Sequence, residues 1–563
     1  MKNRTFFIVS LILICFYALP FMPAAYGKEP VYEVVNPRGF IPEITLHPLA
    51  PRVPDLNDKV VYLITQKAEG SEMETVFDMV KEELVKRFPK VKIEFKYKPS
   101  AYMTDDPALW AEMVKNAQAF IYGAAPSAST THWVTTWAAG LEKKGLPGVT
   151  IVYDTCAETA KTTSEMMGTP VRRAIVTYPP KNMPEKQRAD VMEKVIKGIT
   201  SQPTEQEKRT GKYTPPRPPK IATKGTYSQI QDYFYKQGWT DGLPIVPPTE
   251  EKVKAMLKGT KHPPDTIVAT SIWPEKWHAT VEKVAVNGVM AGCKPEYLPV
   301  LLATAEAWSK GDYASSVRST NSFSYMQVVN GPIRKELDMN AGTYALGPGN
   351  HANATIGRAL RLFIVNLGGG QTGVNILGTQ GNPSAYTCCF PENEEMSPWE
   401  PFSTSQGFKR GDSTVTIFSG GWCHAGNYLA GDLEQLAKAM RGFEFPNGIV
   451  ALLSPQAAKL QAAKGKSKKD VEDFIWKNAT LPLKEFRKDT YYSWFIEPIL
   501  KGKEMYGQKY VWPAEYLTLP ENTEVPVYPR MYINVVVVGG EANPMMQGWK
   551  MAYPSTVSVD KWR

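Results

Sequence analysis

Residues 119–153 have the sequence AFIYGAAPSASTTHWVTTWAAGLEKKGLPGVTIVY, and this stretch decides the fold of the N-terminal part of the chain. Its two ends, 119–123 and 148–153, are apolar runs of strand length, and residues 132–144 between them have helical spacing. A strand, a single helix and a second strand in this order require parallel pairing through a right-handed crossover. The stretch therefore predicts an α/β fold.

The same alternation continues on both sides of this unit. Further strands are predicted at 60–64, 91–95 and 173–177, and further helices at 72–86, 107–116, 156–167 and 184–199. Strands separated by single helices indicate a doubly wound parallel sheet. We therefore expect a flavodoxin-like or Rossmann-like N-terminal domain over residues 28–201.

Polar loops follow three of these strands, at 65–67, 123–132 and 154–156. Ligands of doubly wound sheets bind beyond the carboxyl ends of the strands. The hydroxyl-rich middle loop enters a helix N-terminus, which suits an anion, although simple N-capping would explain the same residues. Cys156 begins a helix, where a thiolate is favoured, although a small buried side chain is the other interpretation. The substrate-binding residues predicted at this rim are Ser127, Ser129, Thr130, His132 and Cys156.

The features around the middle loop resemble the UGSC family. They are a strand, a hydroxyl or thiol loop, Trp133, the segment AGLEKKGLP at 139–147, and a following strand. That family includes selenoproteins and carries a selenocysteine/cysteine-glycine-serine-cysteine motif just before this helix. The register from Trp133 places residues 127–130, Ser-Ala-Ser-Thr, on that motif, so neither redox residue is present. The resemblance implies a pocket for a polar or anionic substrate and does not support thiol–selenol chemistry at this loop.

A polar segment rich in Pro, Lys and Arg, residues 202–226, is typical of an extended linker. It separates the first domain from a larger α/β or α+β domain at 227–563. Segments 241–249 and 281–299 are similar to the long C-terminal region found fused to, or beside, the same domain family. The resemblance implies no defined chemistry for that region.

The second domain contains many loops rich in Gly, Asn and Pro, which let the backbone approach a ligand closely. The helix expected at 354–365 follows such a loop, and its N-terminus could bind an anion. The substrate-binding residues predicted here are Asn350 and Arg358. None of the loops matches a P-loop or a complete dinucleotide-binding motif.

Thiols and imidazoles gather in this same region, at Cys388, Cys389, Cys423, His424 and His351. Thiolate and imidazole ligands suit Cu or Zn, so Cys388, Cys423, His424 and His351 are candidate metal ligands. Cys423, Cys389, His424 and a carboxylate, Glu392 or Glu394, are candidate catalytic groups. A disulfide from Cys388 or Cys389 to Cys423, or inert buried thiols, would explain the same residues.

The N-terminus has the features of a secretory signal. Lys2 and Arg4 precede an apolar run at 6–21, and residues 25–27, Ala-Tyr-Gly, suit signal peptidase. We expect cleavage after Gly27 and a location outside the cytoplasm, with no stable membrane anchor. The chain has six cysteines, so loss of Cys15 with the signal leaves five, an odd number.

Composition excludes some functions. The net charge of +9 is modest for 563 residues, and no basic run is interleaved with aromatic residues, so nucleic acid is not expected as a partner. We expect an extracytoplasmic enzyme that acts on a small polar or anionic substrate in an interdomain cleft, leaning to thiol- or metal-dependent redox or sulfur chemistry. The alternative is a non-catalytic solute- or metal-binding protein. A homo-oligomer is compatible with either.

Overall fold

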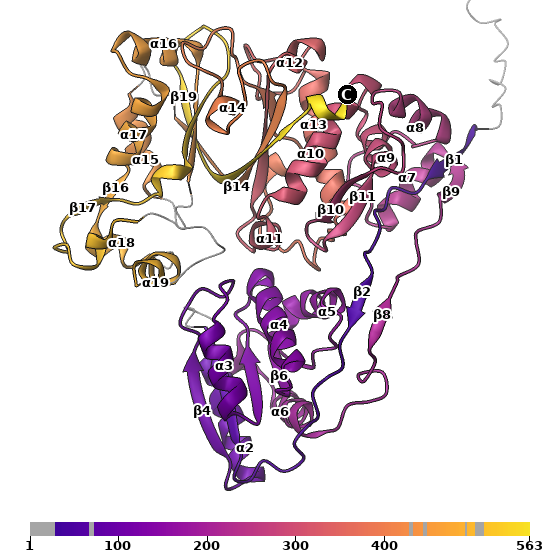
Figure 1. The fold of residues 1–563 in the computed structure, drawn as a ribbon, viewed down its shortest axis with the longest axis vertical. Helices are drawn as coiled ribbons and strands as arrows, with labels where there is room; N and C mark the ends of the chain where they lie inside the picture. Colours follow the sequence, from indigo (N-terminus) through magenta and orange to yellow (C-terminus); the bar gives the residue numbers. More distant parts are fainter. Residues whose placement is uncertain (1–28, 67–71, 427–431, 443–447, 490–491, 502–511) are drawn as a thin grey trace, which may run out of the picture.

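A computed structural model of the chain describes residues 29–66, 72–426, 432–442, 448–489, 492–501 and 512–563. The side chains of residues 422–426 lie outside this description. The molecule consists of two lobes joined by a pair of extended segments (Figure 1). The expected signal at 1–27 also lies outside the described residues.

The first lobe is built on a five-stranded parallel sheet. Its strands are β3 (Val60–Thr65), β4 (Lys92–Tyr97), β5 (Ala119–Gly123), β6 (Gly148–Tyr153) and β7 (Arg173–Val176). The spatial order β4-β3-β5-β6-β7, with every neighbouring pair parallel, is the flavodoxin-like order. The expected doubly wound α/β fold is therefore confirmed.

Helices cover both faces of this sheet. They are α2 (Met73–Arg87), α3 (Pro107–Asn116), α4 (Ala128–Lys143), α5 (Ala157–Met166) and α6 (Glu185–Thr200). Alternate strand residues point to opposite faces, so Leu63 packs in one core with α2 and α6, and Tyr62 packs in the other with α3 and α4. This arrangement leaves the N-termini of α4 and α5 at the carboxyl ends of β5 and β6.

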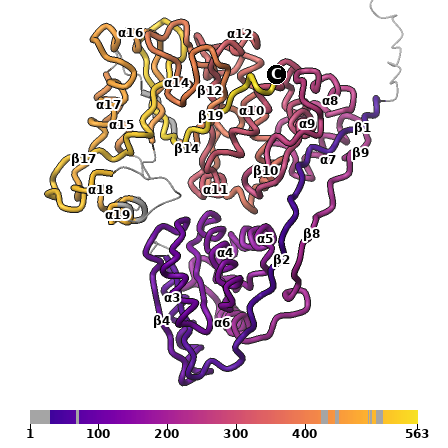
Figure 2. The backbone as a smooth tube through the Cα atoms, viewed as in Figure 1, coloured from indigo at the N-terminus to yellow at the C-terminus, as the bar shows by residue number. Residues whose placement is uncertain are grey.

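The segment expected to be an unpaired linker forms two strands, β8 (Gly211–Tyr213) and β9 (Ile221–Thr226). They pair antiparallel with two N-terminal strands, β2 (Ile44–Leu46) and β1 (Val31–Val35) respectively. The two chain segments run side by side between the lobes (Figure 2). We call β2 and β8 the connector. Because Val34 and Val35 belong to the core of the second lobe, the first domain is inserted between β1 and β9 rather than beginning at residue 28.

The second lobe contains a six-stranded mixed sheet in the order β13-β12-β14-β19-β15-β18. Its strands are β12 (Ser324–Asn330), β13 (Cys389–Pro391), β14 (Thr414–Gly426), β15 (Ile449–Leu453), β18 (Ile533–Val537) and β19 (Met546–Ser558). The outer pairs, β12 with β13 and β15 with β18, are parallel, and the inner pairs are antiparallel. The α/β class expected for this domain is confirmed.

Two groups of helices pack on this sheet (Figure 1). The core next to the connector contains α7 (Tyr227–Lys236), α8 (Glu250–Leu257), α9 (Val281–Ala291), α10 (Leu298–Lys310) and α13 (His351–Leu362), with the hairpin β10 (Ile267–Ile272) and β11 (Trp277–Thr280). A separate core contains α15 (Leu433–Met440), α16 (Pro455–Ala463), α17 (Lys468–Asn478), α18 (Leu483–Phe486) and the hairpin β16 (Thr480–Pro482) and β17 (Glu524–Pro526). The remaining short helices include α11 (Ala314–Val317), α12 (Ile333–Glu336), α14 (Phe402–Ser405) and α19 (Glu497–Leu500). No helix in the described ranges is long and apolar enough to cross a bilayer.

Candidate functional site

The hydroxyl-rich loop lies where the sheet topology predicts it, at the N-terminus of α4. Ser127 is the N-cap residue, yet its side chain makes no capping bond. Its hydroxyl instead lies 3.0 Å from that of Ser129, and its carbonyl accepts a bond of 2.9 Å from the Thr131 N–H. Simple side-chain capping therefore does not account for this loop. Thr130 is buried beside it.

This end of α4 meets the second lobe, at what we call the junction. The second lobe contributes residues 273–276 and 313–318. Trp133 donates from Nε1 to the Ser315 hydroxyl at 3.3 Å, and the Tyr102 hydroxyl hydrogen-bonds to both Ser129 and Ser315. Burial raises the pKa of Tyr102, so it remains a neutral phenol that links the two lobes. The rim of the first domain is thus covered by the second.

His132 is the titratable side chain that the first domain places at the junction. It is only 2% exposed, and its Nδ1 shares a 2.9 Å hydrogen bond with the Thr163 hydroxyl on α5. Burial, followed by the positive charges of Arg318 and Lys276, holds the pKa of His132 well below its usual value. The imidazole is therefore neutral near pH 7, and the two cations that act on it belong to the second lobe.

Arg318 is the most unusual of these groups, because it is fully buried and incompletely paired. Its Nη2 donates to the Pro274 carbonyl at 2.5 Å and lies 3.3 Å from a Glu275 carboxylate oxygen. Among the described residues, its Nε and Nη1 have no hydrogen-bond partner. Burial lowers the pKa of Arg318, but the ordinary value is so high that the guanidinium stays charged. No local sequence pattern marks this arginine, and sequence reasoning missed it.

Lys276 adds a second cation, from the turn between β10 and β11. Its ammonium lies 4.6 Å from the centre of the Trp273 ring, and its backbone has a φ of +56°. A non-glycine residue in this region costs about 1–3 kcal/mol, and such strain is concentrated at functional sites. The Glu275 carboxylate accepts a hydrogen bond of 2.6 Å from the Asn375 amide. Asp312, which acts electrostatically on Lys276, is a second carboxyl group here, so Glu275 and Asp312 oppose the charges of Arg318 and Lys276.

Cys156 lies next to this rim but as a buried thiol. It is 1% exposed, and burial is the main cause that raises its pKa, against hydrogen bonds from Thr155 and Thr131. The thiol is therefore protonated at neutral pH despite its position at a helix start. These contacts favour the interpretation of Cys156 as a small buried side chain.

Asn350 and Arg358 perform structural tasks in the second domain. The Asn350 side chain caps α13 by accepting from the Asn353 N–H at 2.9 Å. Arg358 forms a two-bond ion pair with Asp241, at 2.8 and 2.9 Å, and also donates to the carbonyls of Leu243 and Pro244. These contacts attach the loop at 241–249 to α13, so both predicted binding residues are already engaged.

Glu392 is likewise engaged inside the protein. Its carboxylate is fully buried, and it accepts from the Asn330 amide at 2.7 Å and the Phe402 N–H at 2.6 Å. Lys468 completes an ion pair with it at 3.0 Å. Glu394 accepts from Asn330 and pairs with Arg334. Neither predicted carboxylate faces the junction.

The cysteines and histidines that are close in sequence are separated by the sheet. Cys389 pairs with Gln327 on one side of β12, and Gln327 pairs with Ile417 on the other. Cys423 lies six residues beyond Ile417 along β14, at strand geometry about 20 Å away. A disulfide needs Cα atoms within about 7 Å, so the backbone register does not allow one between Cys389 and Cys423. The side chains of Cys423 and His424 lie outside the described residues.

The other two proposed metal ligands, Cys388 and His351, have different surroundings. Burial raises the pKa of Cys389 well above its ordinary value and that of Cys293 to about 12. Cys388 lines a small pocket with Arg361, whereas His351 is exposed and its Nδ1 lies 3.3 Å from the Tyr297 hydroxyl. In the part of the chain that the structure describes, no three His, Cys, Asp or Glu side chains converge as a metal site would require.

The fold and the junction define a two-domain α/β protein whose flavodoxin-like domain is inserted into a larger one. Residues 33–205 match the model of the UGSC family, which confirms the resemblance for the first domain and the N-terminal segment that leads into it. The chain thus contains a UGSC-family domain. No curated protein is similar enough to this chain to count as a match.

Two of the solved structures with detectable similarity each cover about a quarter of the chain. A flavo di-iron protein mutant from Thermotoga maritima matches at 15% identity over 26% of this chain and 36% of its own length, with a TM-score of 0.19. A flavodoxin-like domain from Synechococcus sp. matches at 15% identity over 25% of this chain and 95% of its own length, with a TM-score of 0.17. The fold assignment therefore rests on the strand order.

Proposed function

We propose that this protein is an enzyme that binds a small oxyanion, such as a carboxylate or a phosphate, at the junction between its two domains. Arg318 is the counter-charge for the anion, and His132 is the base that acts on it. The observation that carries the proposal is the fully buried Arg318, whose Nε and Nη1 have no partner among the described residues.

The energetics of Arg318 support an anionic ligand. Each buried donor without a partner costs about 1–3 kcal/mol, and more when it carries charge. Folded proteins rarely keep such groups without a functional reason. Two neighbouring N–H groups of a guanidinium match two oxygens of a carboxylate or phosphate, and such paired bonds are among the strongest in proteins. Lys276 and the N-terminus of α4 add to the attraction.

His132 is suited to act as a base once an anion is present. If Nδ1 donates to the Thr163 hydroxyl, Nε2 carries a lone pair and can accept a proton. The charge of a bound anion opposes that of Arg318 and Lys276, so binding raises the pKa of His132 back toward its ordinary value. The substrate thereby activates the group that acts on it, since a base works best with a pKa near the working pH.

Access to Arg318 requires the two lobes to separate, because its unpaired nitrogens are inaccessible in this closed arrangement. The chain passes between the lobes along the connector strands β2 and β8. A pair of extended strands is a suitable hinge for such opening. The hydrogen bonds of Trp133 and of Thr159, which donates to the Val374 carbonyl, would break on opening and re-form on closure.

Two further parts of the proposal rest on the sequence. The basic, apolar and small-residue pattern of residues 1–27 supports a location outside the cytoplasm. Thiol- or metal-dependent chemistry has weaker support, because Cys156, Cys293 and Cys389 are buried thiols whose pKa is raised. A non-catalytic extracytoplasmic solute-binding protein is the second candidate, since a two-stranded hinge between closing lobes serves such a protein equally well.

The test is a calorimetric titration of the protein with acetate, malonate, phosphate and sulfate at constant ionic strength. We expect at least one of these anions to bind, and Arg318→Met to abolish that binding. Arg410→Met is the matched control, because Arg410 is exposed and pairs with Glu400 on the surface. Binding by none of the four anions, or equal binding by the Arg318→Met variant, would contradict the proposal.

A second measurement separates the enzyme from the binding protein. Exchange of the malonate C–H protons with D2O is followed by NMR in the presence of the protein. Catalysed exchange that is lost in His132→Asn supports an enzyme with His132 as its base. Binding of malonate without exchange favours the solute-binding protein.

A further inference from the structure

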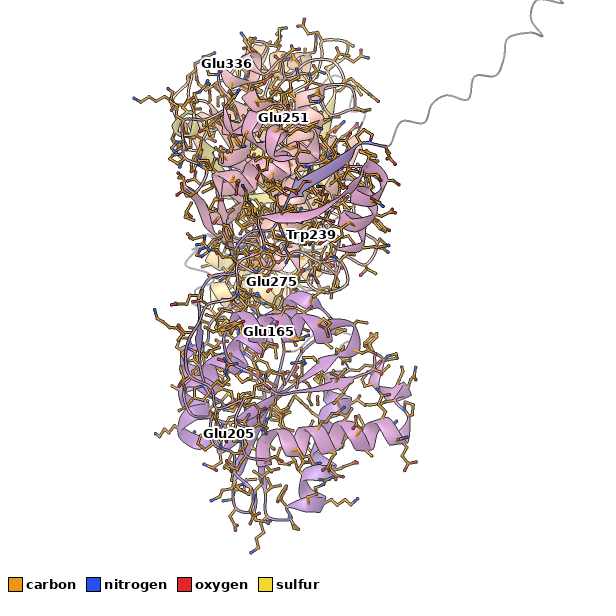
Figure 3. The ribbon with its side chains drawn as sticks, turned by 90° about the vertical axis from the view of Figure 1, so that its right-hand side faces the viewer. Glu165, Glu205, Trp239, Glu251, Glu275 and Glu336 are labelled. Atoms are coloured by element: carbon orange, nitrogen blue, oxygen red, sulfur yellow. The ribbon has the colours of Figure 1, made fainter. Side chains whose placement is uncertain are left out.

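A second feature of the first domain, beside its strand β7, has the form of a binding groove. A cavity of about 1340 Å³ lies between β7, the connector and the second-lobe loops at 275–277 and 369–375. Figure 3 shows Glu165 of the first domain below Glu275 of the second, and both residues line this groove. Pockets for small ligands usually measure about 300–1,000 Å³, so the groove is suited to a longer occupant.

One wall of the groove is the free edge of the parallel sheet, because β7 is the last strand in the sheet order. Thr150 pairs in register with Arg173, and its N–H donates to the Arg172 carbonyl. In a parallel ladder, peptide groups of alternate residues point toward the neighbour, so those of Arg173 and Ile175 point outward. Both residues line the groove, and none of the described residues hydrogen-bonds to these outward groups.

The opposite wall is apolar. The connector contributes Ile44, Leu46 and Tyr213 to the groove, and Pro215 follows them. The Ile175 side chain, on the edge strand itself, is 37% exposed. A chain segment lying along β7 could therefore bond its backbone to the edge and place alternate side chains against apolar surface.

The charges around the groove select an acidic occupant. Three glutamates line it, Glu165, Glu207 and Glu275, against six basic residues. The basic residues are Lys161, Arg172, Arg173, Lys194, Lys197 and Arg209. Glu207 and Glu275 are paired, with Arg172 and Arg318. The three lysines also have acidic partners, Glu158, Asp190 and Glu193, outside the groove. Arg173 and Arg209 have no acidic partner among the described residues. The groove thus has an uncompensated positive charge.

We propose that this groove binds an extended acidic peptide segment of a partner protein, which adds to the sheet as a strand beside β7. Main-chain hydrogen bonds to Arg173 and Ile175 provide the pairing, as in other cases of strand addition to a sheet edge. The side chains of Arg173 and Arg209 provide the preference for Glu and Asp. The residues that carry this proposal, Arg173, Ile175 and Arg209, are not those of the proposed anion site, although Glu275 lines the groove and also pairs with Arg318.

The test measures fluorescence anisotropy of a labelled peptide, Thr-Glu-Val-Glu-Ile-Glu-Thr, titrated with the full-length protein. We expect saturable binding that Arg173→Glu weakens by roughly tenfold or more. Lys92→Glu is the matched control, because Lys92 is an exposed residue on β4, the opposite edge of the same sheet. The same peptide with Lys in place of Glu should not bind.

A second pair of variants tests the backbone pairing itself. Ile175→Pro removes the outward N–H without touching the ladder to β6, a position where an edge strand tolerates proline. Ile175→Thr keeps that N–H and is its control. We expect the proline variant alone to lose binding, and the peptide to protect the Ile175 amide of the unmodified protein from hydrogen exchange.

Several results would overturn the proposal. They are absence of binding, equal binding to the Arg173→Glu variant, or binding without protection of the Ile175 amide. Competition by acetate or malonate as strong as that by unlabelled peptide would show that the groove takes small organic anions instead. Because the exchange measurement uses the unmodified protein, the proposal can be refuted even if Ile175→Pro does not fold.

Discussion

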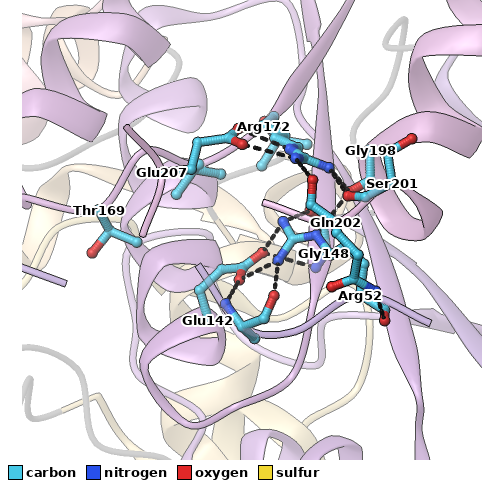
Figure 4. A network of polar contacts seen from close by, with 12 residues as sticks. Arg52, Glu142, Gly148, Thr169, Arg172, Gly198, Ser201, Gln202 and Glu207 are labelled. Carbon is cyan, nitrogen blue, oxygen red and sulfur yellow. Dashed lines mark hydrogen bonds and ion pairs between the residues drawn. The ribbon is translucent and has the colours of Figure 1, made fainter. Parts of the chain in front are cut away.

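Two fully buried arginines, Arg52 in the first domain and Arg318 in the second, have opposite hydrogen-bonding situations. Each pairs with a glutamate and is inaccessible to solvent. Arg52 holds Glu142 through two parallel bonds of 2.9 and 2.8 Å, and it also donates to three backbone carbonyls (Figure 4). Glu142 in turn accepts from the N–H groups of Ala50 and Gly148. Every polar atom of this pair has a partner.

Arg318 is held by far fewer contacts. Its hydrogen-bond partners are one carbonyl and one carboxylate oxygen at 3.3 Å, and two of its nitrogens have none among the described residues. The guanidinium also lies 5.8 Å from the centre of the Trp273 ring. The saturated pair fastens the start of the first domain to α4 and β6, which is a structural task. The unsaturated pair stands where two lobes meet, beside a neutral His132. Incomplete pairing, rather than burial or charge, therefore distinguishes a candidate binding group from a structural one.

The largest expected effect comes from breaking the saturated pair. Arg52→Met leaves the Glu142 carboxylate buried without its counter-charge, so we expect the free energy of unfolding of the first domain to fall by about 3–5 kcal/mol. Urea denaturation followed by circular dichroism measures this change. Arg410→Met, which breaks an exposed pair with Glu400, should change it by less than about 1 kcal/mol. Similar losses in the two variants would show that the Arg52 network is not structural.

The unsaturated pair should respond in the opposite direction. The double variant Arg318→Met with Glu275→Gln removes both charges and the two unpaired donors together. Replacing a buried ion pair in this way is often neutral or stabilising by about 1–4 kcal/mol, so we expect no loss of stability. The same variant should lose anion binding completely. A destabilised double variant would mean that Arg318 is a structural residue like Arg52.

The smallest expected effect concerns the pH dependence that His132 causes. Its pKa in the folded protein is below the unfolded value of about 6.5, so the unfolded state takes up the proton first. Its contribution to stability is complete above pH about 6.5 and is lost as the pH falls toward the folded pKa, with a slope of at most about 1.4 kcal/mol per pH unit. His132→Asn should remove this component from urea denaturation curves recorded between pH 7 and pH 5.

Anion binding provides the control for that measurement. A saturating anion should raise the pKa of His132 in the folded, unmodified protein. The loss of unfolding free energy between pH 7 and pH 5 should then be smaller than without the anion. The pH dependence of stability could instead be the same in the unmodified protein, in His132→Asn and in the anion-bound protein. That result would show that the charges at the junction do not act on His132.

Part of the candidate site could be predicted from the sequence. Ser127, Ser129 and His132 follow a strand of a doubly wound sheet, and topology alone places such residues at the ligand-binding edge. The arginine that faces them lies almost two hundred residues later in an undistinguished segment. Its importance depends on which hydrogen bonds it lacks, and no sequence pattern contains that information.

The cluster of thiols and imidazoles shows the opposite case, in which residues grouped by the sequence are separated by the fold. Cys389 and Cys423 both lie in loop-rich sequence, but β13 and β14 lie on opposite sides of β12, and the register places the two residues about 20 Å apart. The prediction that the Pro-rich segment at 202–226 is only a linker was incomplete for a related reason. Taken by itself it has no pairing partner, whereas in the fold the N-terminal strands β1 and β2 supply one.

The sequence by itself determined the α/β class, the doubly wound parallel sheet of the first domain and its UGSC resemblance. It also determined the helices of that domain, whose boundaries differ from the observed ones by a residue or a few. These follow from hydrophobic periodicity and short connections, which are local properties of the chain. Only the tertiary structure decided which polar groups are satisfied, which lobe covers the rim, and that β7 keeps a free edge. Those outcomes depend on contacts between residues far apart in sequence, and such contacts are set by packing rather than by local pattern.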